Sequence, residues 1–236
     1  MTNPKKVTPE MYQELIQHYK MGTPSNQEIL ALIEAINGCR KILIVGIGCG
    51  RILLALLEYF KIHKIICEIH AVEYNLQFVD YCRNDARLDS VTIHHCSFLD
   101  FPEETQYDAV CMPFTVILTR SLKKQKKWVR KALRLSKKVV IDLLAEPYFV
   151  SKTRMAEVRI VCGTKWEMLF CTNHSSWYVR AAKATGKCIS SKKITYFFMK
   201  GECSIPARKG TEPSTYVLRD VTLSLQHILL VLCEEY

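Results

Sequence analysis

The chain has 236 residues, of which 49% are hydrophobic and 24% are charged. This length and composition suit one α/β domain with its own core and argue against a disordered chain. No apolar stretch reaches the ~20 residues that span a membrane. Residues 1–6 are polar and lack the apolar region of a signal peptide. We therefore expect a soluble cytoplasmic protein with no membrane contact.

The eleven cysteines are expected to be reduced thiols, because disulfides are rare in unsecreted proteins. Most stand in apolar runs such as Ile66-Cys67 and Val110-Cys111, where cysteine behaves as a small hydrophobic residue. No two of them have the spacing of a zinc knuckle. The sequence therefore predicts no metal site.

The net charge of +10 is concentrated in the second half of the chain. Residues 1–118 hold 10 basic and 14 acidic side chains, a net −4, whereas residues 119–236 hold 23 and 9, a net +14. Ten basic residues and no acidic one lie between Arg120 and Lys138. Such an excess indicates a polyanionic partner or an acidic substrate, and a solvated helix face explains it equally well.

The first two predicted elements are helices. Thr8-Pro9-Glu10 begins a helix that runs to about Met21, and a capping box at residues 25–28 begins a second helix that ends before Gly38. The pattern then predicts a strand at 41–45, a helix at 52–60, a strand at 65–72, a helix at 76–86, strands at 91–93 and 108–112, a helix at 122–135 and a strand at 139–144. This alternation is typical of an α/β fold with a doubly wound, mostly parallel sheet.

The pattern weakens after residue 146. Strands are expected at 166–171 and 194–199, a loop at 204–214, and a last helix at 222–232, where apolar residues recur at helical spacing. We therefore expect three parts. These are an N-terminal helix or lid (1–24), a cofactor-binding core (25–146) and an irregular C-terminal extension (147–236) that completes the same domain with strands, a lid or substrate-binding elements.

A glycine-rich loop, Gly46-Ile47-Gly48-Cys49-Gly50, follows the first buried strand. Ligands of open α/β sheets bind beyond the carboxyl ends of the strands, and glycine lets the backbone approach a ligand closely. A dinucleotide fingerprint would read G-x-G-x-x-G. Here the third glycine comes one residue early and position 51 is arginine, which argues against NAD.

The G-x-G-x-G spacing resembles that of class I S-adenosylmethionine-dependent methyltransferases. The second strand ends at Glu73, 23 residues beyond Gly50, where a carboxylate can accept hydrogen bonds from both ribose hydroxyls. Residues 96–102 resemble the family's adenine-contacting loop, and residues 107–113 resemble its fourth-strand motif. The resemblance covers roughly residues 25–145.

The resemblance implies S-adenosyl-L-methionine as the cofactor. It assigns cofactor contacts to the glycine loop, to the end of the second strand, to the adenine-contacting loop and to the end of the fourth strand. The residues concerned are Gly46, Ile47, Gly48, Gly50, Glu73, Tyr74, Ser97, Phe98 and Met112.

The acceptor is harder to infer, because methyl transfer depends largely on positioning and needs a base where the nucleophile carries a proton. The motifs of amino-group methylation and of RNA cytosine methylation are absent from the sequence. His174 is the best candidate base by the pKa range of its side chain, and Tyr19 is a second candidate. We expect a small-molecule acceptor, and the basic half favours an acidic one.

Two alternatives stay open. An RNA- or protein-directed methyltransferase would use the basic helix at 120–138 as a phosphate-binding surface, although Trp128 is its single aromatic residue. A non-catalytic adenosyl-binding scaffold protein is suggested by Ile44 and Ser97, which stand where the family usually has acidic residues.

Overall fold

The computed structural model describes residues 8–10, 27–113, 122–144, 156–162, 164–170, 187–206 and 215–234. Pro9 and Glu10 are helical, and the rest of the first predicted helix lies outside the described residues. The second predicted helix is α2 (Gln27–Ala35).

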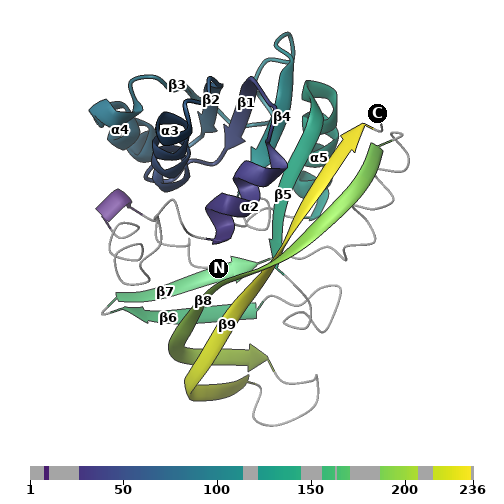
Figure 1. The fold of residues 1–236 in the computed structure, drawn as a ribbon. Helices are drawn as coiled ribbons and strands as arrows, with labels where there is room; N and C mark the ends of the chain where they lie inside the picture. The colour runs from purple at the N-terminus through teal and green to yellow at the C-terminus, as the bar shows by residue number, and fades with distance from the viewer. Residues whose placement is uncertain are drawn as a thin grey trace.

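The described strands form one nine-stranded sheet in the order β3-β2-β1-β4-β5-β9-β8-β6-β7 (Figure 1). Its first five strands are parallel, as the sequence predicted. They are β1 (Lys41–Val45), β2 (Glu68–Glu73), β3 (Thr92–His95), β4 (Tyr107–Met112) and β5 (Ser136–Leu144).

Helices cover both faces of the parallel part of the sheet. On one face, α2, α3 (Arg51–His63) and α4 (Leu76–Arg83) pack on alternate strand residues such as Ile42 and Ile44. On the other face, α5 (Leu122–Leu135) packs on Leu43 and Val45. Because successive side chains of a strand point to opposite faces, the continuous apolar run of β1 fills both cores. This confirms the doubly wound fold class.

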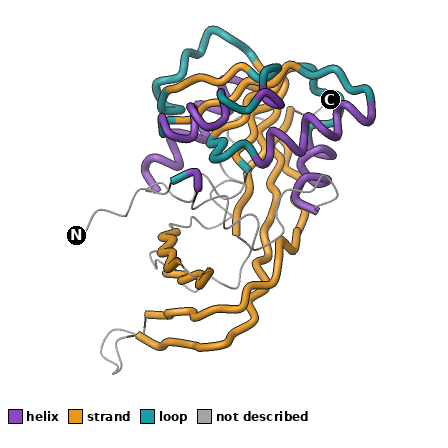
Figure 2. Tube along the Cα trace, turned by 90° about the vertical axis from the view of Figure 1, so that its left-hand side faces the viewer, coloured by secondary structure: helices purple, strands orange, loops and turns teal. Residues whose placement is uncertain are grey.

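The described parts of the C-terminal extension are strands. The hairpin of β6 (Ala156–Cys162) and β7 (Thr164–Phe170) lies at the sheet edge, next to β8 (Lys187–Pro206). β9 (Thr215–Glu234) runs antiparallel to both β8 and β5. Figure 2 shows β8 and β9 continuing well beyond the parallel part of the sheet.

The predicted helix at 222–232 is wrong, because these residues belong to β9. Ile228, Leu229 and Leu232 pair with β5 on one edge and with β8 on the other. The sequence of a strand that is paired on both edges inside a sheet is a continuous apolar run. Such a run also has apolar residues at the spacing expected of a helix. The predicted loop at 204–214 begins later than expected, since β8 continues to Pro206 and residues 207–214 lie outside the described residues.

A buried ion pair fixes α2 against the start of α3. Arg51 Nη1 lies 2.7 Å from Glu28 Oε2, and Arg51 Nη2 donates to Glu28 Oε1 at 2.8 Å. The side chains are 4% and 3% exposed. In this bidentate geometry the two hydrogen bonds best offset the hydration that the guanidinium and the carboxylate lose on burial.

We predict that Arg51→Ala or Glu28→Ala lowers the free energy of unfolding by about 3–5 kcal/mol, because each leaves one buried charge unpaired. Urea denaturation measures the loss. The double variant Glu28→Met/Arg51→Met should lose less than either single variant, since it leaves no unpaired charge. Single variants within about 0.5 kcal/mol of the wild type would contradict a buried pair.

Candidate cofactor site

The glycine loop after β1 has a backbone that glycine favours. The φ angles are 78° at Gly46, 51° at Gly48 and 80° at Gly50, all in the left-handed region. A Cβ on Gly50 would lie 2.9 Å from Leu88 Cδ1 and 3.2 Å from Cys82 Sγ. Glycine is therefore required at position 50 both by the positive φ angle and by the lack of room for a Cβ. α3 begins directly after Gly50.

The carboxylate of Glu73, at the end of β2, is buried and binds this loop. Its Oε2 accepts hydrogen bonds from the backbone N–H of Ile47 at 3.1 Å and, more weakly, of Gly48 at 3.5 Å. Its Oε1 accepts from the N–H groups of Tyr74 at 3.0 Å and Asn75 at 2.9 Å. Hydrogen bonds to an ionised acceptor are stronger than neutral ones, so Glu73 fixes the loop to the end of the neighbouring strand.

A turn after β3 forms the next part of the site. Ser97 Oγ accepts a hydrogen bond from the N–H of Leu99 at 3.3 Å, and the Ser97 carbonyl accepts from Asp100 at 2.9 Å and Phe101 at 3.1 Å. The Cys96 N–H donates to the Glu73 carbonyl at 3.1 Å, which joins this turn to the end of β2. Ser97 thus shapes the turn through its own hydrogen bonds.

Two buried residues of α5 hold this turn from the other side. The Nζ of Lys131 donates to the carbonyls of Leu99, at 2.8 Å, and Phe101. The Trp128 ring meets the Phe98 ring edge to face, with centroids 5.2 Å apart. Sequence reasoning missed the role of Lys131 because it treated the basic residues of this helix together, as one possible phosphate-binding surface. The available signal was its position three residues after Trp128, on the same side of the helix.

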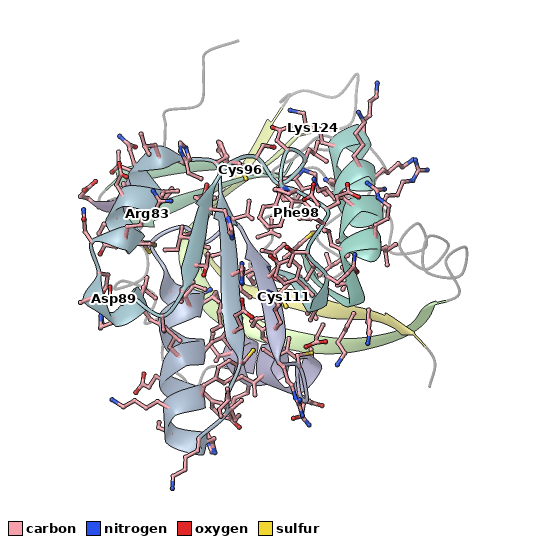
Figure 3. The ribbon with its side chains drawn as sticks, turned by 90° about the horizontal axis from the view of Figure 1, so that it is seen from above. Arg83, Asp89, Cys96, Phe98, Cys111 and Lys124 are labelled. Carbon is pink, nitrogen blue, oxygen red and sulfur yellow. The ribbon has the colours of Figure 1, made fainter. Side chains whose placement is uncertain are left out.

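These segments enclose a cavity of about 310 Å³ at the carboxyl ends of the parallel strands. Figure 3 shows Phe98 between the strands and α5, with Cys96 and Lys124 labelled nearby. The lining residues are Val45, Gly46, Val72, Glu73, Tyr74, Cys96, Ser97, Phe98, Leu99, Lys124 and Trp128. The volume falls at the lower end of the range of ligand pockets, ~300–1,000 Å³.

The structure brings part of the predicted set together. Five of the nine predicted cofactor residues line the cavity, namely Gly46, Glu73, Tyr74, Ser97 and Phe98. Of the other four, Ile47, Gly48 and Gly50 belong to the loop without lining the cavity, and Met112 is fully buried in the core. The candidate bases His174 and Tyr19 lie outside the described residues. The cavity adds Lys124 and Trp128 of α5, which sequence reasoning did not assign to the cofactor.

Three further observations on the described residues concern metal ligands, membrane-spanning helices and disulfides. Among them, no three His, Cys, Asp or Glu side chains are placed to hold a metal ion together. No helix in this part of the chain is long and apolar enough to cross a membrane. Its six cysteines with described side chains are free thiols.

Comparison with known proteins agrees with this geometry. Residues 42–138 match the family model of a methyltransferase domain. Residues 42–138 are therefore similar to a methyltransferase domain, and the chain has the fold of solved methyltransferases that bind S-adenosylmethionine or S-adenosylhomocysteine. No curated protein sequence matches the chain.

Solved structures share the fold at low sequence identity. DesVI from Streptomyces venezuelae matches with a TM-score of 0.60 and 15% identity, over 98% of this chain and 100% of that one. The sugar N-methyltransferase KedS8 from a Streptoalloteichus species matches with 0.60 and 14%, over 100% and 97%. Magnesium protoporphyrin IX methyltransferase from Synechocystis, with bound S-adenosylhomocysteine, matches with 0.56 and 10%, over 98% and 90%.

We predict that two buried thiols, Cys49 in the glycine loop and Cys82 beside it, do not react with iodoacetamide in the folded protein at pH 8. Burial raises the pKa of Cys49 to about 11 and that of Cys82 to about 12. At pH 8, about one Cys49 thiol in a thousand, and fewer of Cys82, would then be the reactive thiolate. Peptide mass spectrometry before and after unfolding in urea measures the labelling. Rapid labelling of either thiol in the folded protein would contradict the packing around the loop.

Proposed function

We propose that the chain transfers the methyl group of S-adenosylmethionine to a small-molecule acceptor that carries negative charge. The observation behind this proposal is the cavity at the end of β1 and β2, where a glycine loop, a buried carboxylate and an aromatic wall meet. The basic second half of the chain supports an anionic acceptor. The likeness to a sugar N-methyltransferase supports a small one.

The lining of the cavity fits an adenosine. Val72, Phe98 and the half-exposed Tyr74 offer apolar and aromatic surface for a purine, and Glu73 offers a carboxylate for ribose hydroxyls. The contact of Glu73 with the Gly48 N–H, at 3.5 Å, is the longest of its four. A ribose hydroxyl can therefore replace this contact with the least disturbance of the loop.

In this proposal, bound S-adenosylmethionine supplies an activated methyl group, and the chain positions the cofactor and the acceptor and supplies a base. Gly46 keeps the backbone close to the cofactor, and Trp128 and Phe98 exclude water from one side of the cavity. His174 or Tyr19 would accept the proton of the acceptor. Residues 1–24 and 147–236 would bind the acceptor around the core at 25–146, in a reduced, cytoplasmic protein.

Two observations weigh against the alternatives. Trp128 is 5% exposed and packs on Phe98, so the outer side of α5 offers no aromatic ring for stacking on RNA bases. Ile44 is fully buried in the core on the α2 and α3 face, so its apolar side chain is explained by packing. This weakens the case for a non-catalytic scaffold protein.

We predict that Glu73→Gln lowers the affinity for S-adenosylmethionine by about 10- to 100-fold, because charge-assisted hydrogen bonds contribute about 1.5–3 kcal/mol each. Calorimetric titration measures the affinity. Asp100→Asn is the matched control, since Asp100 loses the same charge on the adjoining turn without lining the cavity. Equal affinity in the wild type and Glu73→Gln would show that this carboxylate does not hold the cofactor.

The acceptor class is tested with S-adenosylmethionine that carries a radioactive methyl group. The protein is incubated with separated small-molecule, RNA and protein fractions of a cell extract, and Glu73→Gln is the control. We expect label in the small-molecule fraction, retained by an anion exchanger. Label that precipitates with acid, and is released by ribonuclease or protease, would contradict a small acceptor.

A further inference from the structure

The exposed side of α5 carries a row of basic residues that the cofactor cavity does not use. Lys123, Lys127, Arg130 and Arg134, here called the basic stripe, are spaced by four, three and four residues and therefore share one side of the helix. All four are exposed. At 1.5 Å per residue, the stripe is about 16 Å long.

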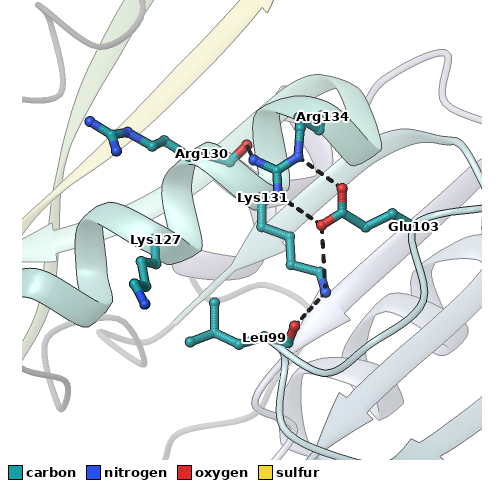
Figure 4. Close-up of a pocket in the computed structure, with 6 residues that line it drawn as sticks. All are labelled: Leu99, Glu103, Lys127, Arg130, Lys131 and Arg134. Carbon is teal, nitrogen blue, oxygen red and sulfur yellow. Dashed lines mark hydrogen bonds and ion pairs between the residues drawn. The ribbon is translucent and has the colours of Figure 1, made fainter.

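A groove of about 280 Å³ lies beside the stripe (Figure 4). It is lined by Leu99, Glu103, Lys127, Arg130, Lys131 and Arg134. Four cationic side chains and one carboxylate give the lining a net charge of +3. A concave surface with charge of one sign attracts the opposite charge more strongly than a flat one.

The four cationic side chains that line the groove differ in the hydrogen bonds and ion pairs that they make. Arg134 Nε and Nη2 donate to the Glu103 carboxylate at 2.8 and 2.7 Å, and Lys131 Nζ lies 3.8 Å from Glu103 Oε1. The side chains of Lys127 and Arg130 make no hydrogen bond or ion pair with the other residues that line the groove. As far as the described part of the chain goes, the groove therefore holds two cations that are fixed in place and two that are available to an anion.

The groove and stripe lie next to the cofactor cavity. Leu99 lines both the groove and the cavity. Lys124, the neighbour of the first stripe residue, also lines the cavity. A ligand that lies along the stripe can therefore reach the cavity from its α5 side.

We propose that the basic stripe and its groove bind a ligand with several linked phosphate groups. The inference rests on the proposed function, because it assigns the negative charge of the acceptor to these phosphates. A single phosphate would contact the groove only, whereas a row of cations about 16 Å long can contact several linked phosphates. One guanidinium can donate two parallel hydrogen bonds to a phosphate group. Trp128 is buried, so charge is the means of recognition on the outer side of α5.

The test compares two probes, inorganic tripolyphosphate and a single-stranded RNA of twelve uridines, by calorimetry and fluorescence anisotropy at several salt concentrations. Lys127→Ala/Arg130→Ala removes the two available charges. Arg40→Ala/Lys61→Ala is the matched control, because it also removes two exposed charges, just before β1 and on α3, away from α5. Glu103→Gln is a third variant, since it removes the negative charge of the groove.

We expect the stripe variant to bind the anion about tenfold more weakly, with a smaller salt dependence, and the matched control to bind like the wild type. Glu103→Gln should bind more tightly. Binding of tripolyphosphate supports a small phosphate ester as the ligand, and binding of the RNA alone would overturn a small ligand and assign the stripe to a polymer. Binding of neither probe, or equal losses in the stripe variant and the control, would overturn the proposal.

The same preparations are titrated with S-adenosylmethionine. This titration separates the proposal of a phosphate-binding surface from the proposed methyltransferase function. Lys127 and Arg130 do not line the cofactor cavity, so the stripe variant should keep its cofactor affinity. Cofactor binding without anion binding would overturn the phosphate surface and leave the cofactor site standing. A wild type that binds no cofactor would overturn the proposed function itself.

Discussion

The buried carboxylate of Glu73 is the constraint on which the site depends. A carboxylate removed from water must be hydrogen-bonded, and the backbone N–H groups that satisfy it come from the glycine loop and from the end of its own strand. β1 and β2 are neighbours, with Val45 opposite Val72. The loop can therefore reach the carboxylate, and both become one wall of the cavity.

The parallel half of the sheet was predictable because its signals are local. Strands such as Lys41–Val45 are continuous apolar runs, since both of their faces are covered by helices. The glycine loop and Glu73 were found from their spacing together with the family resemblance, and a parallel sheet places the ends of consecutive strands at the same edge. The turn at Ser97 and Phe98 followed from family resemblance, and the structure places both residues in the cavity wall.

The features that sequence reasoning missed depend on contacts between residues far apart in the chain. The last strand, Thr215–Glu234, was read as a helix over its second half because its apolar run suits both structures, and pairing with β5 and β8 decides between them. Glu28 lies 23 residues from Arg51 in sequence, and Lys131 lies 32 residues from Leu99. The local pattern does not identify these distant partners, and only the position of Lys131, three residues after Trp128, indicates that its side chain faces inward.

One helix thus serves two purposes. Its inner side, through Trp128 and Lys131, supports the turn that lines the cofactor cavity, and its outer side carries the available positive charge. The cavity on the inner side of α5 is the proposed binding site of S-adenosylmethionine. Calorimetric titration of the wild-type protein with S-adenosylmethionine tests it most directly. We predict saturable binding of one cofactor per chain, and the absence of saturable heat at millimolar cofactor would show that the cavity does not bind it.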